Sequence, residues 1–311
     1  MPLAAVTGAT GFLGRRLVAA LAAEGWRVRV LARRDAALAA PDGVEPEVVI
    51  GGLADGAALA ALCRGSDVVI HAAGLIKARA AADFAGVNAA GAERVALAAR
   101  AAGVPRMLLV SSLAAREPRL SPYAASKRAG EEAAGKVLGE RLTVMRPPAI
   151  YGPGDLETLG VFEAALRLPV APVFDSRARL AMIHVEDAAR QIAAAAATPP
   201  ERPVVALSDA RAEGYGWREI VGAASRAVGR ESLMVEMPSL ALSLAGAAGA
   251  TLRLFGANPI LTPGKAREMR HLDWSLRPEE RWSSAPAPKF DLAEGFAHTV
   301  AWWRVAGKLR S

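Results

Sequence analysis

The feature of this chain that most restricts its fold is an apolar strand that leads directly into three regularly spaced glycines. Leu3 to Thr7 forms the strand pattern, Gly8, Gly11 and Gly14 follow with two residues between neighbours, and a helical pattern comes next. Glycine lets the backbone turn sharply and approach a pyrophosphate closely, while free N–H groups at the helix start face its negative charge. Strand, turn and helix together predict a cradle for a nucleotide diphosphate.

The residues after the third glycine exclude one common phosphate-binding loop. A P-loop needs a lysine and then a hydroxyl residue after its last glycine, whereas Gly14 is followed by Arg15 and Arg16. The spacing also differs from the GxGxxG fingerprint of many dinucleotide-binding proteins. A nucleoside triphosphatase is therefore not expected.

Strand and helix patterns alternate strictly through the first half of the chain. Strands are predicted at 3–7, 27–32, 48–50, 67–71, 106–110 and 141–145, and helices at 54–63, 83–101 and 121–138. Continuous apolar strands such as Met107 to Val110 indicate burial on both faces of a sheet. This pattern predicts an α/β fold with a doubly wound parallel sheet, a Rossmann fold, whose ligands bind beyond the carboxyl ends of the strands.

Beyond residue 150 the alternation loosens among several prolines, and it returns with a strand at 180–184, a helix through 197 and a strand near 204–207. We therefore assign 1–150 and 178–207 to the dinucleotide-binding domain. Residues 151–177 and 208–311 form a smaller, mostly helical C-terminal substrate-binding part.

Charge and rare residues narrow the class of function. The net charge is +7, but no basic block is interleaved with aromatic residues, so no nucleic-acid partner is expected. Cys63 is the only cysteine, which excludes an intrachain disulfide, and the four histidines lack metal-ligand spacing, so no metal site is predicted.

No secretory signal is visible at the start of the chain, and a cytoplasmic protein is expected. The uncharged stretch Leu240 to Leu252 is too short, at about 13 residues, for the roughly 20 that span a bilayer. It is interpreted as a buried helix, with a surface-bound or substrate-facing apolar helix as the alternative.

The helix predicted at 121–138 carries the residues expected to perform the chemistry. Ser121 and Pro122 are typical of a helix start, and Tyr123 and Lys127 follow four residues apart, on one helix face. This helix comes after the strand that ends at the pair Ser111 and Ser112. A hydroxyl, a phenol and an ammonium group are thereby expected beside the bound dinucleotide.

These groups resemble the Ser-Tyr-Lys set of the short-chain dehydrogenase/reductase superfamily. Other matching stretches are Val69 to Gly74, Val87 to Gly91, Arg146 to Gly154 and Ile183 to Asp187. The last two are typical of the extended subfamily, which includes nucleotide-sugar epimerases and dehydratases, 3β-hydroxysteroid dehydrogenases and dihydroflavonol reductases. The resemblance covers about residues 3–197.

The resemblance implies a role for each member of the set. Tyr123 is the general acid/base, because the Lys127 cation and the oxidised nicotinamide favour its phenolate form. Lys127 also holds the nicotinamide ribose, and Ser112 orients the substrate carbonyl or carbinol, with Ser111 as the alternative. Asn88 matches the additional asparagine of the family, with a purely structural helix-face role equally open.

The residues at the end of the second strand indicate whether the chain uses NAD or NADP. Relatives that use NAD place a carboxylate there, but this chain has Arg33 and Arg34 before Asp35. A guanidinium suits a 2′-phosphate, so NADP is predicted, with NAD as the alternative and with Arg34 or Arg15 supporting Arg33. The full predicted cofactor-binding set is Gly8, Thr10, Gly11, Phe12, Leu13, Gly14, Arg33, Arg34, Gly52, Leu53, His71, Ala72, Ala73, Gly74, Asn88, Ser111, Tyr123, Lys127, Pro147 and Ile150.

The leading functional hypothesis is an NADP(H)-dependent oxidoreductase that exchanges hydride with a carbonyl or secondary alcohol of a small substrate, an apolar one being favoured. A nucleotide-sugar epimerase and a noncatalytic dinucleotide-binding scaffold or assembly factor remain as alternatives. Leu113 to Ala115 offers no acid pair, which disfavours a dehydratase. Helices 83–101 and 121–138 form a dimer interface in many relatives, so a homodimer is one expected state.

Overall fold

The structure is a computed structural model that describes residues 1–34, 44–238 and 262–309. Its contacts divide the chain into two compact units. Unit 1 comprises Met1–Pro147, Ala188–Leu207 and Glu279–Pro286, and unit 2 comprises Pro148–Asp187, Ser208–Pro278 and Ala287–Ser311. The predicted stretch Leu240 to Leu252 lies outside the described residues.

Unit 1 is built on a seven-stranded parallel sheet in the order β11-β6-β5-β4-β1-β2-β3. The strands are β1 (Leu3–Thr7), β2 (Arg27–Ala32), β3 (Glu47–Ile50), β4 (Val68–His71), β5 (Arg106–Val110), β6 (Leu142–Arg146) and β11 (Val204–Ala206). Most of their central residues are buried, as the continuous apolar runs predicted, whereas β3 at the edge of the sheet is only half-buried. The doubly wound sheet is thereby confirmed.

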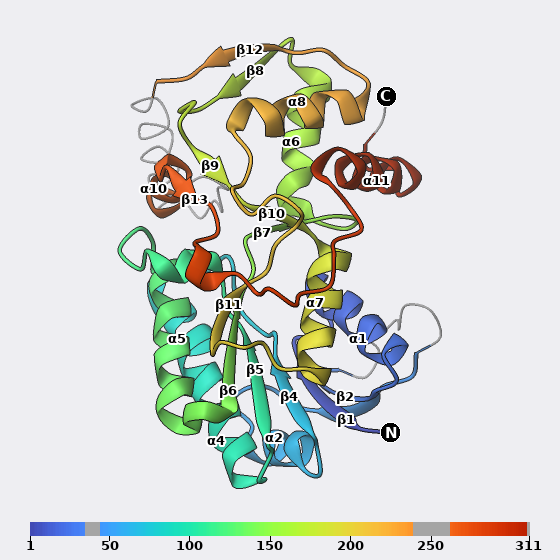
Figure 1. The fold of residues 1–311 in the computed structure, drawn as a ribbon, viewed down its shortest axis with the longest axis vertical. Coiled ribbons are helices and arrows are strands. Elements are labelled where there is room, and N and C mark those ends of the chain that lie inside the picture. Colours follow the sequence, from blue (N-terminus) through green and yellow to red (C-terminus); the bar gives the residue numbers. More distant parts are fainter. Residues whose placement is uncertain (35–43, 239–261, 310–311) are drawn as a thin grey trace. The chain divides into compact units, whose positions relative to one another are not determined.

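Helices cover both faces of this sheet (Figure 1). They are α1 (Phe12–Ala23), α2 (Gly56–Cys63), α4 (Ala90–Ala101), α5 (Pro122–Leu138) and α7 (Val185–Ala197). Small and aliphatic residues of α2, α4 and α5 form one core with the inner side chains of the strands. Alanine-rich helices lie close to the sheet in this way, because small side chains permit a short separation.

The predicted helix 83–101 is divided into three segments. A short α3 (Ala81–Phe84) is followed by a π-helical turn, η3 (Ala85–Ala89), and then by α4. A π-turn inserts one extra residue into a helix and is frequent at functional sites. Asn88 is the buried residue of this turn, so the turn decides where its side chain points.

Unit 2 combines helices with three two-stranded parallel sheets. The helices are α6 (Leu156–Arg167), α8 (Trp217–Val228), α10 (Pro263–Arg270) and α11 (Leu292–Val305). The strand pairs are β7 (Ala149–Tyr151) with β10 (Met182–His184), β8 (Val170–Val173) with β12 (Leu233–Glu236), and β9 (Arg179–Leu180) with β13 (Asp273–Trp274). Its core contains the aromatic side chains of Tyr151, Phe162 and Phe296, in edge contacts.

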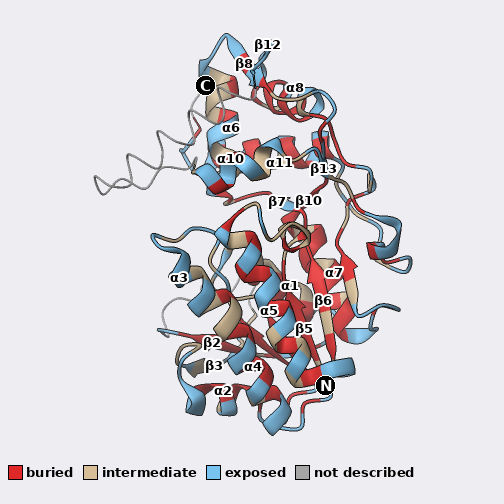
Figure 2. Cartoon of the chain, turned by 90° about the vertical axis from the view of Figure 1, so that its left-hand side faces the viewer, coloured by how far each residue is buried: buried red, intermediate tan, exposed pale blue. Residues whose placement is uncertain are grey.

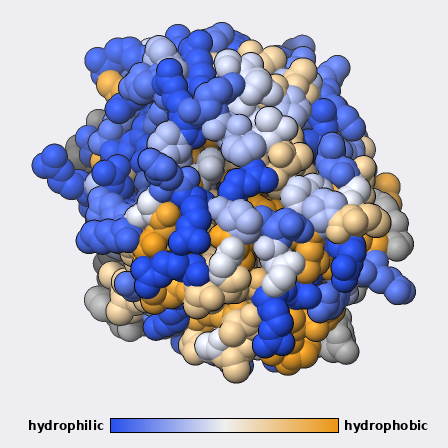
Figure 3. Space-filling view, turned by 60° about the horizontal axis from the view of Figure 1, so that its bottom comes forward, coloured by the Kyte–Doolittle hydropathy of each residue, from blue (hydrophilic) through white to orange (hydrophobic). Residues whose placement is uncertain are grey.

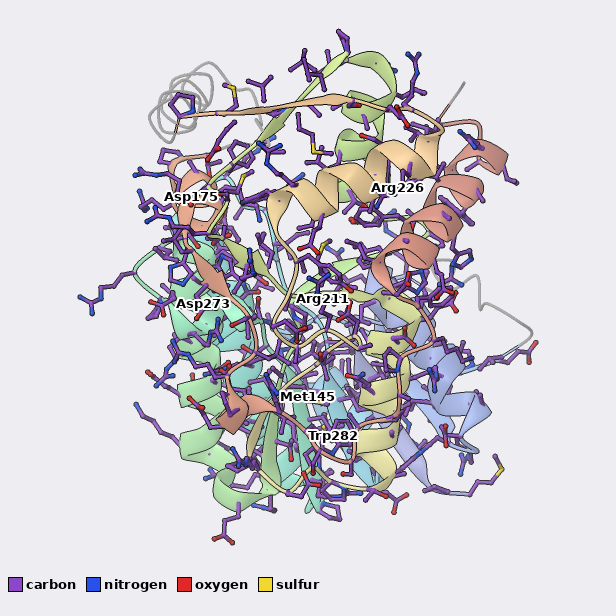
Figure 4. All side chains as sticks on the ribbon, turned by 45° about the horizontal axis from the view of Figure 1, so that its top comes forward. Met145, Asp175, Arg211, Arg226, Asp273 and Trp282 are labelled. Carbon is purple, nitrogen blue, oxygen red and sulfur yellow. The ribbon has the colours of Figure 1, made fainter. Side chains whose placement is uncertain are left out.

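Three segments group differently from the domain boundaries predicted above, and the first of them, 148–150, falls in unit 2. Residues 178–187 pair with β7 and β13, which places them in unit 2. Residues 279–286 belong to unit 1, where Arg281 forms a bridge with Ala206 and Trp282, labelled in Figure 4, is buried. The division of cofactor and substrate binding between the two parts stays a prediction.

β8 and β12 carry apolar side chains on their exposed face as well as on their buried face. Ala171 and Val173 point inward against Val221, whereas Leu233 and Val235 are exposed. Exposed positions of these strands are pale blue in Figure 2.

A surface groove in unit 1 runs between α2 and α4 and is lined by Leu59, Leu97 and Ala98, with Arg64 and Arg94 also in its wall. It shares no residue with the predicted site. On the face drawn in Figure 3, hydrophilic and apolar side chains are intermixed.

Candidate active site

The glycine turn after β1 has no room for larger residues. Gly8 adopts a φ of +79°, and a Cβ there would lie 2.5 Å from the backbone nitrogen of Ala73. A Cβ on Gly14 would collide with the carbonyl oxygen of Gly8. Glycine is thus required at Gly8 by the backbone conformation and at Gly14 by the close packing of α1 on the turn.

The start of α1 presents backbone donors without a competing side chain. Gly11 is the N-cap, makes no side-chain capping bond, and is exposed, and the first turn contains no acidic residue. Thr10, Phe12 and Leu13 are half-buried around it, and the Arg15 Nε donates to the carbonyl of Thr10 at 3.1 Å. A helix start of this kind fits a pyrophosphate, because its unpaired N–H groups and positive dipole end face the anion.

His71 at the end of β4 joins this turn through a buried hydrogen bond. Its Nδ1 lies 2.6 Å from the Thr7 hydroxyl, which also accepts from the backbone N–H of Ala73 at 3.3 Å. Burial, with a smaller contribution from the Lys127 charge, lowers the pKa of His71 to about 3. His71 is therefore neutral at physiological pH, and the Thr7 hydroxyl that it contacts holds Ala73 beside the glycine turn.

Asn88 connects that segment to α5. Its Oδ1 accepts from the Leu75 N–H at 2.8 Å, and its Nδ2 donates to the Leu75 carbonyl and to the Ser126 hydroxyl, both at 2.9 Å. A Cβ on Gly74 would approach the Asn88 Oδ1 to 3.1 Å and the Lys127 Nζ to 3.7 Å. The amide thus holds the loop after β4 beside the predicted catalytic lysine.

The helix that carries Tyr123 and Lys127 starts as predicted. Ser121 caps α5 by accepting from the Ala124 N–H at 3.0 Å, and Pro122 is its first residue. Tyr123 is half-buried, with its ring edge-on to Phe84 at 6.0 Å between centroids.

Lys127 is buried, and its ammonium donates to the Val110 carbonyl at 2.8 Å. Burial lowers the pKa of Lys127 to about 8, against the opposing effect of the Glu131 carboxylate. The lysine is therefore a localised cation at neutral pH that loses its charge in mildly alkaline solution.

The two serines after β5 have different surroundings. The buried Ser111 hydroxyl donates to Glu131 Oε1 at 2.5 Å. Ser112 is half-buried, and its hydroxyl caps the short turn Leu113–Arg116 by accepting from the Ala114 N–H at 3.2 Å. Since an accepting hydroxyl keeps its own proton for donation, Ser112 is the better candidate for contact with a substrate oxygen.

The remaining predicted cofactor contacts lie at other strand ends. Arg33 and Arg34 follow β2 and are both exposed, while Leu53 packs against Gly91 of α4. Gly52 precedes Leu53, and Pro147 follows β6, where its carbonyl accepts from the Leu113 N–H at 2.9 Å. Ile150 lies in unit 2, so its part in the site stays a prediction along with the other individual roles.

Sequence reasoning missed one buried group in this region, the carboxylate of Glu131. It forms two hydrogen bonds with Arg146, at 2.9 and 2.7 Å, in addition to the bond from Ser111. Arg146 also contacts Glu280 at 3.1 Å, and Glu280 pairs with Arg116 at 2.9 Å. The available signal was the spacing of Glu131, four residues beyond Lys127 on the same helix face.

Two histidines that are distant in sequence meet in unit 2. His184 Nε2 lies 3.3 Å from His298 Nδ1, and the ligand atoms of Glu186 are within 4.8 Å of both. The backbone N–H of Glu186 donates to His184 Nδ1, which leaves the proton of the neutral ring on Nε2. We therefore interpret this cluster as a hydrogen-bonded pair, since a metal at Nε2 would need the opposite tautomer.

The doubly wound sheet, the glycine cradle at its edge and the phenol and ammonium groups on α5 define an NAD(P)-dependent enzyme of the extended short-chain dehydrogenase/reductase type. The sequence profile described as "NAD dependent epimerase/dehydratase family" matches residues 4–206, and the chain belongs to this family.

Relatives with named activities include reductases. A ceramide reductase of Caulobacter vibrioides (strain NA1000 / CB15N) is 50% identical over 306 residues, which cover 98% of this chain and 95% of that protein. A 4-hydroxy-2-methyl-3-oxo-4-farnesyl-3,4-dihydroquinoline-1-oxide ketoreductase of Stigmatella aurantiaca is 35% identical over 181 residues, 52% of this chain and 54% of that protein.

Solved structures with a similar fold align over nearly the full length of the chain. The crystal structure of gox2253 has a TM-score of 0.78 at 21% identity and covers 99% of both chains. DesIV, a dTDP-glucose 4,6-dehydratase from Streptomyces venezuelae with NAD and TYD bound, has a TM-score of 0.71 at 24% identity and covers 98% of this chain and 97% of its own. Within the described part of this chain, no helix is both long and apolar enough to cross a membrane.

Proposed function

We propose that this chain is an NADPH-dependent reductase that converts the ketone of a ceramide-type lipid into a secondary alcohol. The observation that carries the proposal is the buried Lys127 ammonium, held by the Val110 carbonyl one helical turn from Tyr123. The carbonyl that accepts from Lys127 lies two residues before Ser112, which supports a joint role for Ser112, Tyr123 and Lys127.

Each residue of the set has a distinct task in ketone reduction. The nicotinamide supplies the hydride that adds to the carbonyl carbon. Tyr123 donates the proton that the carbonyl oxygen needs, and Lys127 stabilises the phenolate that remains. Ser112 donates a hydrogen bond to the same oxygen and orients the carbonyl. One hydride and one proton together convert the ketone into the alcohol.

The substrate class is inferred from the relatives. The Caulobacter protein, matched along nearly its whole length, is named a ceramide reductase. Ceramides are N-acylated long-chain amino alcohols, and a ketone at the carbon of their secondary alcohol is the group on which the Tyr123 and Lys127 pair can act. The Stigmatella ketoreductase, whose name includes a farnesyl group, also favours reduction of an apolar molecule.

Net consumption of cofactor separates this function from epimerisation. With an N-acylated long-chain amino ketone in detergent micelles, we expect one NADPH to be oxidised for each alcohol formed. An epimerase would return its cofactor to the starting state and act on nucleotide sugars. Interconversion of nucleotide sugars without net oxidation, and no reaction with the amino ketone, would contradict the proposal.

Preference for NADPH is the second part of the proposal, and it is supported by the position of Arg33 at the exposed end of β2. A guanidinium binds a 2′-phosphate through two charge-assisted hydrogen bonds. Replacing Arg33 with serine should weaken NADPH binding by roughly 10- to 100-fold and leave NADH binding nearly unchanged.

Isothermal titration of both cofactors measures this preference. Arg27→Ser is the matched control, because Arg27 is an exposed arginine at the opposite end of the same strand. Wild-type protein that binds NADH as tightly as NADPH would contradict the preference.

A further inference from the structure

The helix of the catalytic pair continues in register to a third ionisable side chain. Tyr123, Lys127 and Glu131 follow one another at intervals of four residues on α5, and both Lys127 and Glu131 are buried. A buried carboxylate is costly unless it is paired and hydrogen-bonded, so its partners indicate what its charge is used for.

The partners of Glu131 come from the two strands beside α5. Its Oε1 accepts from the Ser111 hydroxyl at 2.5 Å and from the Arg146 Nε at 2.9 Å, and its Oε2 accepts from the Arg146 Nη2 at 2.7 Å. Both carboxylate oxygens are therefore occupied, and the bidentate geometry gives the group a single orientation.

Three consecutive residues at the end of β5 share this support. The Val110 carbonyl accepts from Lys127, the Ser111 hydroxyl donates to Glu131, and Ser112 is the candidate for contact with the substrate oxygen. A carboxylate that holds the middle residue restrains the backbone on either side of it. The bond from the Ser111 side chain thus adds to the backbone bonds from the Ser111 N–H to Met145 and from the Leu113 N–H to Pro147 in fixing the lysine acceptor and Ser112.

We propose that Glu131 is a positioning residue of the reductase, which holds Ser111 so that the neighbouring Val110 and Ser112 meet Lys127 and the substrate. The proposal rests on the proposed function for its kinetic consequences, but not for its effect on the lysine.

The charges around Lys127 determine in which direction its pKa should change when Glu131 is replaced. On α5 it faces Tyr123 and Glu131, and from β4 it faces His71, which is neutral near pH 7. The charge of Arg146 on β6 is shared between Glu131 and Glu280. Glu131 is thus the carboxylate that favours the protonated lysine and opposes the effect of burial.

Direct titration of Lys127 tests this inference without any substrate. The chain contains six lysines, so the side-chain carbon signals of selectively labelled lysine can be assigned with a Lys127→Arg variant. In the wild type the pKa of Lys127 is about 8, and in Glu131→Gln we expect it to fall by about one pH unit or more. Because the protonated form is required, the alkaline limb of kcat should move to lower pH by the same amount.

Two matched variants show whether a change in the Lys127 pKa is specific to the loss of Glu131 or follows from the loss of any nearby carboxylate. Glu280→Gln removes the other carboxylate of Arg146 without touching Ser111, and Glu132→Gln removes an exposed neighbour paired with Arg128. Both should leave the Lys127 titration near that of the wild type. An unchanged pKa in Glu131→Gln, or an equal shift in Glu280→Gln, would overturn the proposal.

Glu131→Asp supplies the test if Glu131→Gln does not fold. The shorter side chain keeps the charge but withdraws from Ser111, so the Lys127 titration should stay near that of the wild type while kcat falls. Equal kcat in this variant and the wild type would contradict the positioning role. If the wild type reduces no ceramide-type ketone but the pKa of Lys127 still falls in Glu131→Gln, the proposed substrate is rejected and the role of Glu131 stands.

Discussion

Replacing Tyr123 with phenylalanine is expected to lower kcat for ketone reduction by roughly 10²- to 10⁴-fold, the usual contribution of a general acid. The variant keeps the ring that contacts Phe84 and loses only the hydroxyl that donates the proton. Thermal stability and NADPH affinity should therefore change little. Single-turnover kinetics of NADPH oxidation measure the effect on the chemical step.

Tyr151→Phe is the matched control for this experiment. Tyr151 is fully buried in unit 2, its hydroxyl donates to the Asp291 carbonyl at 3.3 Å, and burial raises the pKa of this phenol. Such a group is a poor proton donor near neutral pH, so its loss should affect stability rather than the chemical step. Equal rates for Tyr123→Phe and the wild type would exclude Tyr123 as the acid.

Replacing Gly14 with alanine should weaken NADPH binding by roughly 100-fold, which corresponds to about 3 kcal/mol. The new methyl group would collide with the Gly8 carbonyl, so either α1 or the glycine turn must move. Both movements displace the backbone donors at the start of α1 from the pyrophosphate. Isothermal titration with NADPH measures the loss.

Gly56→Ala tests whether any glycine replacement near a helix start has the same effect. Gly56 is the first residue of α2, and a Cβ there meets no atom within 4 Å. Alanine is favoured over glycine in a helix, so stability should rise slightly and NADPH binding should not change. Tight NADPH binding by Gly14→Ala would contradict the assignment of the turn as the cofactor cradle.

The strands of unit 1 were predictable because each buried strand is a continuous apolar run between helical patterns. β1, β2 and β5 begin and end at the predicted residues, and the other predicted boundaries of the sheet differ by about one residue. The start of α5 was also predictable from Ser121 and Pro122, since capping is a local interaction.

The short strands of unit 2 could not be predicted in the same way. β8 contains Pro172 and pairs with β12, more than 50 residues away, so neither strand has a local partner that its sequence would reveal. The π-turn that contains Asn88 was missed because one inserted residue hardly alters the apolar periodicity of a helix.

The residues of the predicted site could likewise be identified only where they lie close together in the sequence. Tyr123 and Lys127 share one helix face, but the bonds from Glu131 to Ser111 and Arg146 cross 20 and 15 residues and depend on the packing of α5 against β5 and β6. The contact between His184 and His298 crosses 114 residues. Such pairs are set by tertiary structure, which residue spacing does not encode.

The most direct test of the central claim follows the hydride itself. The purified protein is supplied with NADPH carrying deuterium at the nicotinamide C4 position and with an N-acylated long-chain amino ketone, and the product is examined by mass spectrometry. With one of the two C4-deuterated epimers of NADPH, we expect one deuterium at the new carbinol carbon for each NADPH oxidised. With the other epimer, we expect an alcohol without deuterium. An alcohol free of deuterium with both epimers, or a cofactor that is never consumed, would contradict reduction by this site.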